Sequence, residues 1–301
     1  MIKRISFKIE EENFINKRLD KVITEYNKEF SRSFLKKYLK NLKVNNKTEK
    51  LSHICKINDF IELEIEYNEE PEDIEKEYIP LDIIYEDENY IVINKKSGMV
   101  THPAKGNWKG TIVNALLYLN KTLSDKDRYR PGIVHRLDKE TSGLLLIAKN
   151  NISHEYLTTL FQKREIVKKY HAIVKGNFTK TNLIIKNRIG RDRENRKKMA
   201  VLNDGRGKES ITIVHLIKNI KNYSYLDIEL KTGRTHQIRV HLSYIGYPIL
   251  GDKIYGRKSR EYSDIPLCLN AYYLAFFDKF SNKNLAFEIK DPYFFNEILG
   301  E

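Results

Sequence analysis

The chain has 301 residues, of which 41% are hydrophobic and 32% charged, a balance that is typical of a globular protein and excludes a disordered one. Its formal net charge of +13 favours a polyanionic partner such as nucleic acid. No apolar run approaches the ~18 residues of a membrane span, and the N-terminus lacks the apolar core of a signal peptide, so we expect a cytoplasmic protein with no membrane partner.

The first predicted elements form a small module. Alternating apolar residues over 1–10 predict an edge strand, and a helix follows with apolar residues at i, i+3, i+4 and i+7 from Leu19. Ser31 is a good N-cap for a second helix, predicted to continue to about residue 43. Its polar side carries basic residues spaced four, four and three, which predicts one RNA-binding stripe or, alternatively, a solvated face: Arg32, Lys36, Lys40 and Lys43.

The sign of the charge then changes abruptly. Residues 32–56 contain eight basic residues and one acidic residue, whereas residues 62–77 contain nine acidic residues and one basic residue. Acidic, polar stretches of this kind are typical of solvated linkers. We therefore predict a module at 1–66, a linker at 67–79 and a larger domain at 80–301.

The larger domain begins with two strands, at 83–85 and 90–94, and a helix from Thr111. A strand is expected at 144–148, a helix at 152–163, a strand at 168–175, hairpins within 184–214, and strands at 211–218 and 224–230. We predict a helix over 235–244, although its alternation also fits a strand. Many strands without a regular strand–helix–strand order indicate an α+β fold with a mixed sheet.

Several common catalytic sites are missing. The chain has no phosphate-binding glycine loop, no His-Glu-x-x-His and no Gly-x-Ser-x-Gly motif. Its two cysteines lie far apart, and His236 and His241 are five residues apart, which is poor spacing for two ligands on one helical face. We therefore expect no metal and no nucleotide cofactor, and we interpret these histidines as core or hydrogen-bonding residues.

The most informative stretch is "PGIVHRLDKETSGLLLIAKN" at 131–150. Taken alone, Asp138 could simply cap backbone amides in a turn before a buried strand. However, "HRLDKETSGLLLIAK" closely resembles the catalytic motif of the RluA-type RNA pseudouridine synthases. Three more segments resemble that family in the same order, so that the resemblance covers about residues 80–280: "IVINKKSGMVTHPAKGNWKGTIVNALL", "KKYHAIVKG" and "LKTGRTHQIRVHLSYIGYPILGDKIYG".

The module at 1–66 resembles the S-four-type RNA-binding domain, through "RLDKVI", "SRSFLKKYL" and "LKVNN". The usual Asn-Gly turn is Asn45-Asn46 here, a change that is tolerable because Asn accepts left-handed turn geometry. The resemblance implies a small α+β module before a catalytic domain with a mixed, mostly antiparallel sheet.

The resemblance also implies an isomerisation of uridine to pseudouridine in RNA, which needs no cofactor. Asp138 would act at the glycosidic bond of a flipped-out uridine, either as a nucleophile or as the base of an elimination route. Arg239 would hold the charge of Asp138, and Tyr170 would pack against the uracil. Arg136 would fill the gap left in the RNA. An exposed helix arginine and an ordinary core tyrosine are the alternatives for Arg239 and Tyr170.

Ribosomal RNA of the large subunit is the expected substrate, with transfer RNA as the alternative. Residues 186–208, with nine basic and three acidic residues, would contact phosphates unless they form a merely solvated hairpin. One departure from the family is Asn270, where a His is usual; Asn also forms hydrogen bonds, so we expect activity to be retained. The competing functions are a non-catalytic RNA-binding protein and a glycosidic-bond hydrolase, which usually needs a carboxylate pair.

Overall fold

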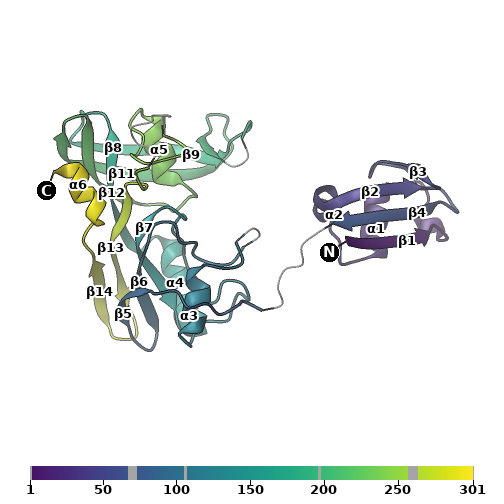
Figure 1. Ribbon diagram of the computed structural model, residues 1–301, viewed down its shortest axis with the longest axis horizontal. Helices are drawn as coiled ribbons and strands as arrows, with labels where there is room; N and C mark the ends of the chain where they lie inside the picture. The colour runs from purple at the N-terminus through teal and green to yellow at the C-terminus, as the bar shows by residue number, and fades with distance from the viewer. Residues whose placement is uncertain (1, 67–72, 105–106, 196–197, 257–263, 301) are drawn as a thin grey trace. The chain divides into compact units, whose positions relative to one another are not determined.

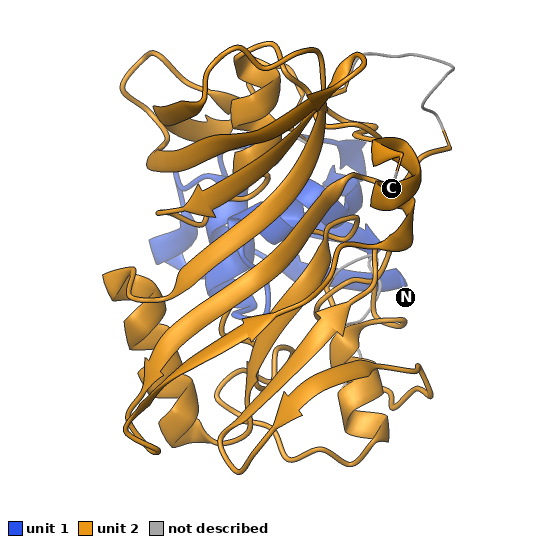
Figure 2. Cartoon of the chain, turned by 90° about the vertical axis from the view of Figure 1, so that its left-hand side faces the viewer, with its two compact units in different colours: residues 1–72 blue, residues 73–301 orange. Residues whose placement is uncertain are grey.

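The chain, seen in a computed structural model that describes residues 2–66, 73–104, 107–195, 198–256 and 264–300, divides into two compact units, Met1–Glu72 and Asp73–Glu301 (Figures 1 and 2). Each unit has a hydrophobic core of its own. Residues 67–72 of the predicted linker lie outside the described residues. Further along that stretch, Asn114 donates from its side chain to the carbonyl of Glu75 (2.7 Å), which ties this end of the stretch to the larger unit.

The N-terminal unit is a four-stranded antiparallel sheet in the order β1-β4-β2-β3. Its elements are β1 (Ile2–Lys8), η1 (Glu12–Phe14), α1 (Leu19–Tyr26), α2 (Arg32–Tyr38), β2 (Leu39–Val44), β3 (Lys47–Thr48) and β4 (Phe60–Glu66). Ser31 caps α2 by accepting from the Phe34 amide (3.1 Å), as predicted. The turn between β2 and β3 places Asn45 and Asn46 at φ 51° and 63°, which confirms the expected left-handed geometry.

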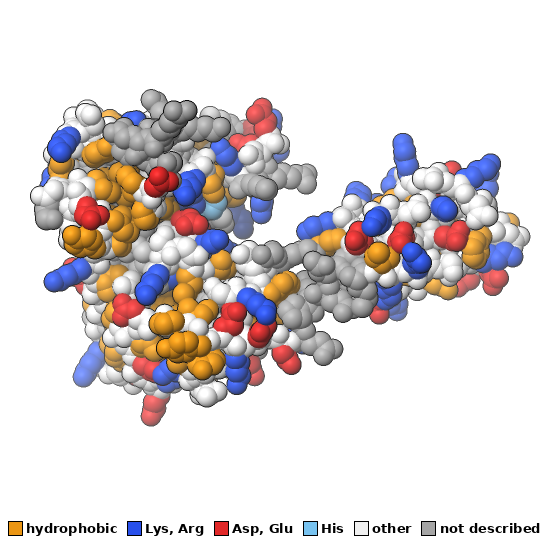
Figure 3. Space-filling model, viewed as in Figure 1, with side chains coloured by type: hydrophobic (Ala, Val, Ile, Leu, Met, Phe, Trp, Pro, Cys, Tyr) orange, Lys and Arg blue, Asp and Glu red, His pale blue; other side chains and the backbone are white. Residues whose placement is uncertain are grey.

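The predicted helix from Ser31 to about residue 43 is wrong in its second half. The helix ends at Tyr38, and Lys40 and Lys43 lie on β2 instead. On β2, which pairs with β4, the side chains of Leu42 and Val44 are buried, as expected of the two-residue period of a strand. The predicted helix would also have buried Leu42, so the burial of this residue did not distinguish the two structures. The four basic residues therefore do not form a stripe on one helix, and Figure 3 shows basic and acidic side chains intermixed over the visible face of this unit.

The larger unit is built on one broad, twisted sheet (Figure 2). The strand order is β10-β9-β11-β12-β8-β13-β7-β6-β5, with β14 paired to β13; the β13–β7 pair is parallel and the others are antiparallel. This confirms the predicted mixed, mostly antiparallel sheet. The strands are β5 (Asp82–Glu86), β6 (Tyr90–Lys95), β7 (Ser142–Ala148), β8 (Val167–Lys175), β9 (Asn182–Arg191), β10 (Met199–Val201), β11 (Lys208–Ile220), β12 (Tyr223–Leu230), β13 (Leu269–Asp278) and β14 (Lys283–Glu288).

Four helices accompany this sheet in the part of the chain that is described: α3 (Ile112–Tyr118), α4 (Asn151–Lys163), α5 (Gln237–Tyr244) and α6 (Tyr293–Leu299). The predicted helix over 235–244 is confirmed by α5. Residues Gln237 to Leu242 are all buried, so the helix has no exposed face in its first turns. This explains why its hydrophobic pattern also fitted a strand.

Strand β7 fixes the position of the residues before it. All seven of its residues are buried, with Leu145 and Ile147 in one core cluster and Leu144 and Leu146 in another. Its second residue, Gly143, has φ 113°, and a side chain there would collide with the backbone of Ala271 on β13. Only glycine permits this close parallel approach, which anchors the loop at 137–141 to the centre of the sheet.

Candidate active site

A cavity of about 530 Å³ opens beside the loop that precedes β7. Its walls come from that loop, the end of α4, the start of β8 and the connection from β12 to α5. Among the described residues, six basic side chains line it, so the cavity favours an anionic ligand: Arg136, Arg164, Lys168, Lys231, Arg234 and Arg239.

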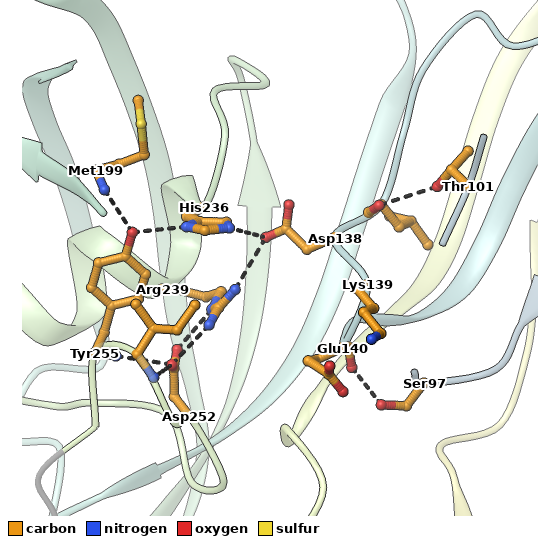
Figure 4. Close-up of polar contacts among 12 residues, drawn as sticks. Ser97, Thr101, Asp138, Lys139, Glu140, Met199, His236, Arg239, Asp252 and Tyr255 are labelled. Carbon is orange, nitrogen blue, oxygen red and sulfur yellow. Dashed lines mark hydrogen bonds and ion pairs between the residues drawn. The ribbon is translucent and has the colours of Figure 1, made fainter. Parts of the chain in front are cut away.

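The loop that carries Asp138 is fixed through its backbone carbonyls. Donors from residues 95–101 reach three of them: Thr101 Oγ1 to Leu137 O (3.2 Å), Lys95 Nζ and Gly98 N to Lys139 O (3.0 and 2.9 Å), and Ser97 Oγ to Glu140 O (2.7 Å). The carbonyl of Asp138 itself accepts from the Thr141 amide (3.1 Å). Because the backbone is held in this way, the Asp138 side chain remains available to the cavity that it lines (Figure 4).

Lys95 is an unusual part of this support. It is 1% exposed, and its ammonium group donates to the carbonyls of Lys96, Met99 and Lys139 at 2.9–3.0 Å. Burial lowers the pKa of Lys95 to about 7, although the charges of Asp138 and Glu140 oppose the shift. Lys95 therefore supports the loop through hydrogen bonds to backbone carbonyls, which carry no charge to compensate its ammonium group.

Two nitrogen-bearing side chains approach the Asp138 carboxylate. Arg239 Nη1 lies 3.6 Å from Oδ2, and His236 Nε2 lies 3.8 Å from the same oxygen (Figure 4). Both distances are too long for direct hydrogen bonds. The carboxylate is 17% exposed and is held by charge rather than by tight hydrogen bonds.

Arg239 has a closer partner than Asp138. Its Nε and Nη2 donate to the two oxygens of Asp252 at 2.7 and 2.8 Å, a two-pronged contact between buried groups. Burial alone would raise the pKa of Asp252, but the hydrogen bonds and charge of Arg239, with the amides of Ile254 and Tyr255, lower it below its usual value. Asp252 thus fixes the guanidinium group, which presents its remaining edge to Asp138.

Tyr170 and His135 both line the cavity, but their contacts differ. Tyr170, on β8, is 7% exposed and lines the cavity; burial, and then the charge of Asp138, raise its pKa well above the usual range, so the phenol stays protonated. His135 accepts from the Leu146 amide through Nε2 (2.9 Å) and stacks on Phe161, and burial lowers its pKa to about 3. His135 therefore shapes the loop, whereas Tyr170 faces the ligand space.

Comparisons with known proteins identify the family of this chain. Residues 89–244 match the family model described as RNA pseudouridylate synthase. The chain is 46% identical over 219 residues to "Ribosomal large subunit pseudouridine synthase D" of Borreliella burgdorferi, an alignment that covers 71% of this chain and 67% of that protein. The chain belongs to the RNA pseudouridine synthase family.

Other similar proteins support the assignment of the chain to this family. The protein of the same name from Zymomonas mobilis is 42% identical over 232 residues, which cover 74% of this chain and 71% of that one. The structure of "Human RNA Pseudouridylate Synthase Domain Containing 1" superposes with a TM-score of 0.61 at 26% identity, over 75% of this chain and 87% of that chain. The enzyme is thus an isomerase that acts on RNA.

The predicted site residues of the synthase fall into two groups. Arg136, Asp138, Tyr170 and Arg239 line one cavity of the larger unit, although three of them are far apart in sequence. Arg32, Lys36, Lys40 and Lys43 belong to the N-terminal unit. There Arg32 binds the buried Asp20 (2.7 Å) and Lys40 pairs with Glu66 (2.8 Å).

Sequence reasoning missed the supporting residues of the synthase: Lys95, Asp252 and Tyr255. Asp252 and Tyr255 belong to "LGDKIYG", a segment that was already matched to the family but in which no residue was singled out. The signal was an acidic residue shortly after an arginine, and it becomes informative only once the loop after α5 is seen to fold back against the helix.

Among the described residues, no group of three or more His, Cys, Asp or Glu could hold a metal ion. No described helix is long and apolar enough to cross a membrane.

The departure at Asn270 also has a structural account. Its side chain accepts from Ser142 Oγ (3.0 Å) and donates to Asp291 Oδ1 (2.9 Å), behind the start of β7. Asn270 is fully buried, and it forms the hydrogen bonds expected of it in the position where the family usually has His.

Proposed function

We propose that this synthase converts specific uridines of large-subunit (23S) ribosomal RNA to pseudouridine, and that Asp138 acts at the glycosidic bond of a flipped-out uridine. Three relatives at 40–46% identity bear the name ribosomal large subunit pseudouridine synthase D, which supports the choice of substrate. The observation that carries the proposal is a partly exposed carboxylate in a cationic cavity, with its oxygens not occupied by close hydrogen bonds.

The reaction breaks the bond between ribose C1′ and uracil N1, joins C1′ to uracil C5, removes a proton from C5 and adds one to N1. Atoms and electrons balance within the substrate and water, so the reaction consumes no redox equivalent. Asp138 either attacks C1′ or removes a ribose proton that opens an elimination route. Both routes need an ionised carboxylate, and Arg239 Nη1 and His236 Nε2 lie 3.6 and 3.8 Å from the Oδ2 atom of Asp138.

Tyr170 would contact the base while Asp138 contacts the ribose. An aromatic ring in the wall of the cavity suits an extruded uracil, because unstacked bases regain stacking on such side chains. The raised pKa of Tyr170 keeps its hydroxyl protonated at neutral pH, so it can donate a hydrogen bond to the base. The exposed Arg136, two residues before Asp138, would occupy the space that the flipped uridine leaves in the RNA.

Binding of the rest of the RNA would rest on phosphate contacts outside the cavity. The basic residues of 186–208 belong to the same unit; residues 196 and 197 lie outside the described part of the chain. In the N-terminal unit, Lys36 and Lys43 are the stronger candidates for phosphate contacts, because Arg32 and Lys40 already pair with acidic residues. Such contacts supply affinity and orientation but little sequence choice.

The test is to map pseudouridines in ribosomal and transfer RNA from cells that lack the protein and from cells complemented with variants. Wild type should restore defined positions in 23S RNA, and Asp138→Asn should restore none. Glu140→Gln is the matched control, because this exposed carboxylate two residues away is the second acid that a hydrolase would need. Equal restoration by Asp138→Asn would overturn the role of Asp138, and marks restored only in transfer RNA would overturn the substrate.

A further inference from the structure

His236 has an unusual backbone for a residue at the start of a helix. It precedes α5 in the left-handed conformation, with φ 56° and ψ 19°, and its side chain makes no capping hydrogen bond. Non-glycine residues adopt this conformation at a cost and keep it where surrounding contacts hold them, commonly at functional sites. Here the imidazole ring points away from the helix, between Tyr255 and Asp138 (Figure 4).

Three contacts connect strand β10 to Asp138 through this ring. The Met199 amide donates to the Tyr255 hydroxyl (2.9 Å), the same hydroxyl lies 2.8 Å from His236 Nδ1, and His236 Nε2 lies 3.8 Å from Asp138 Oδ2 (Figure 4). The participants come from β10, the loop after α5, the start of α5 and the loop before β7. No local sequence pattern brings these four segments together.

The first contact favours one direction for the second. The Met199 amide can only donate, so the Tyr255 oxygen accepts from it. The Tyr255 hydroxyl then has one proton to give, and His236 Nδ1 lies at hydrogen-bond distance. If Nδ1 accepts that proton, a neutral imidazole must carry its own hydrogen on Nε2, the nitrogen that faces Asp138.

Burial favours the neutral ring of His236, and the charges around the ring act in both directions. Burial lowers the pKa of His236; the charge of Asp138 opposes this, Arg239 and Arg136 reinforce it, and Asp252 opposes it. These four groups belong to the loop before β7, to α5 and to the loop after it. A neutral imidazole has a single N–H, so its placement on Nε2 rather than Nδ1 decides whether Asp138 faces a donor or a lone pair.

We propose that His236 is a positioning residue that offers an Nε2–H donor to Asp138, and that Tyr255 makes this orientation depend on strand β10. This inference rests on the proposed function of Asp138. Strand β10 pairs with β9, where Met199 lies opposite Arg191, and both residues belong to the basic segment 186–208. RNA phosphates that hold this segment would keep the Met199 amide on Tyr255 and thereby hold His236 Nε2–H toward the carboxylate.

Substitutions of His236 separate its two nitrogens. In His236→Asn the amide reaches only as far as Nδ1, so it can keep the Tyr255 contact and the left-handed backbone, which Asn tolerates, while it loses the group that faces Asp138. In His236→Gln the amide reaches about as far as Nε2. We expect the single-turnover rate of pseudouridine formation to fall about tenfold or more in His236→Asn and less in His236→Gln, with RNA affinity unchanged within about twofold.

Two further variants test the link to β10. Tyr255→Phe removes the hydroxyl but keeps the ring, which lies 5.2 Å from the Arg239 guanidinium carbon. Met199→Pro removes the donor amide without removing a hydrogen bond of the sheet, because β10 is an edge strand and this N–H points to Tyr255. Met199→Leu is the matched control. We expect about a tenfold loss in Tyr255→Phe, a smaller loss in Met199→Pro and none in Met199→Leu.

The deciding experiment combines these rates with the ¹⁵N spectrum of His236 in the full-length protein. We expect a neutral ring protonated at Nε2 in wild type, and mixed tautomers in Tyr255→Phe. A proton on Nδ1 in wild type would overturn the inference whatever the activity, as would a His236→Asn variant as fast as wild type on ribosomal RNA. A wild type that modifies no RNA would instead reject the proposed function, while the spectrum would still decide the state of His236.

Discussion

Asp20 in the N-terminal unit and Asp138 in the larger unit are both aspartates beside arginines, but their contacts differ. Asp20 is fully buried and accepts hydrogen bonds from Arg18 and Arg32 at distances down to 2.7 Å. Asp138 is 17% exposed, and its nearest cation lies 3.6 Å away. Asp252 resembles Asp20, since it too is buried and bound by a close arginine. The comparison distinguishes Asp20 and Asp252, whose oxygens bind close arginines, from Asp138, whose oxygens remain available to a substrate.

The pKa of Asp20 reflects its close arginine partners. Burial alone would raise the pKa of Asp20, but the hydrogen bonds from Arg18 and Arg32 outweigh it and lower the pKa below its usual value. That part of the stability is present at neutral pH and is lost as the pH falls through the lowered pKa, when the folded carboxylate takes up a proton. No donor in the described part of the chain reaches Asp138 at such a distance, so its role should lie in the reaction rather than in stability.

The largest expected effect comes from Asp138→Asn. The single-turnover rate on ribosomal RNA should fall by about a thousandfold or more, because no other carboxylate lines the cavity among the described residues. The free energy of unfolding in urea should change by less than about 1 kcal/mol, because both ionic contacts of Asp138 are long. A loss of stability as large as that of a buried ion pair would show that Asp138 is a structural residue like Asp20.

Asp252→Asn should reduce both stability and rate. It removes the charge that compensates the buried Arg239, which costs about 3–5 kcal/mol in comparable buried pairs. It also frees the guanidinium group to turn away from Asp138, so the rate should fall as well. Urea unfolding and single-turnover assays on the same preparation measure the two effects.

Asp20→Asn is the matched control for Asp252→Asn. It should cost less, about 1–3 kcal/mol, because Arg18 and Arg32 are nearly half exposed and remain hydrated. Its single-turnover rate at saturating enzyme should equal that of wild type. If Asp20→Asn slowed the reaction as much as Asp252→Asn does, the division between the two kinds of carboxylate would be unfounded.

The sequence predicted the sheet class and the positions of α4 and α5. It also predicted the RNA-modifying family, through the segments that contain Asp138, Tyr170 and Arg239. Those features depend on periodicity within a segment or on motifs with many fixed letters. It failed at residues 39–44, where a helical and a strand period bury the same leucine and only pairing with β4 distinguishes them. It also missed the contacts of Asp252 and Tyr255, because such partners are determined by how a loop folds back on a helix.

Removal of residues 1–66 compares the two units by their contribution to RNA binding. We expect affinity for ribosomal RNA to weaken about tenfold and its dependence on salt to become shallower, because lysines that displace counterions are lost. The single-turnover rate at saturating enzyme should be nearly unchanged, since the cavity lies wholly in the larger unit. Unchanged affinity would show that the basic residues of the N-terminal unit form only a solvated surface.

The comparison of buried charged groups also includes Lys95, whose ammonium group donates to backbone carbonyls. Its pKa of about 7 in the folded protein lies below the 10.5 of an exposed lysine, so between these values the unfolded chain binds more protons than the folded one. Stability should therefore rise with pH through this window, by about 1 kcal/mol from pH 7 to 8. Lys95→Met should remove this slope, whereas Lys139→Met, at an exposed position in the Asp138 loop, should retain it.

The sign of that slope distinguishes Lys95 from the arginines. If a carboxylate held Lys95 as Asp252 holds Arg239, its pKa would rise rather than fall, and stability would decline as the pH increased through it. Urea unfolding at several pH values in wild type and both variants measures the slope directly. If the free energy of unfolding of wild type stayed constant or fell as the pH increased, the charge of Lys95 would be balanced as closely as that of Arg239. The loop before β7 would then be held by an ion pair of Lys95 and not by hydrogen bonds to carbonyls alone.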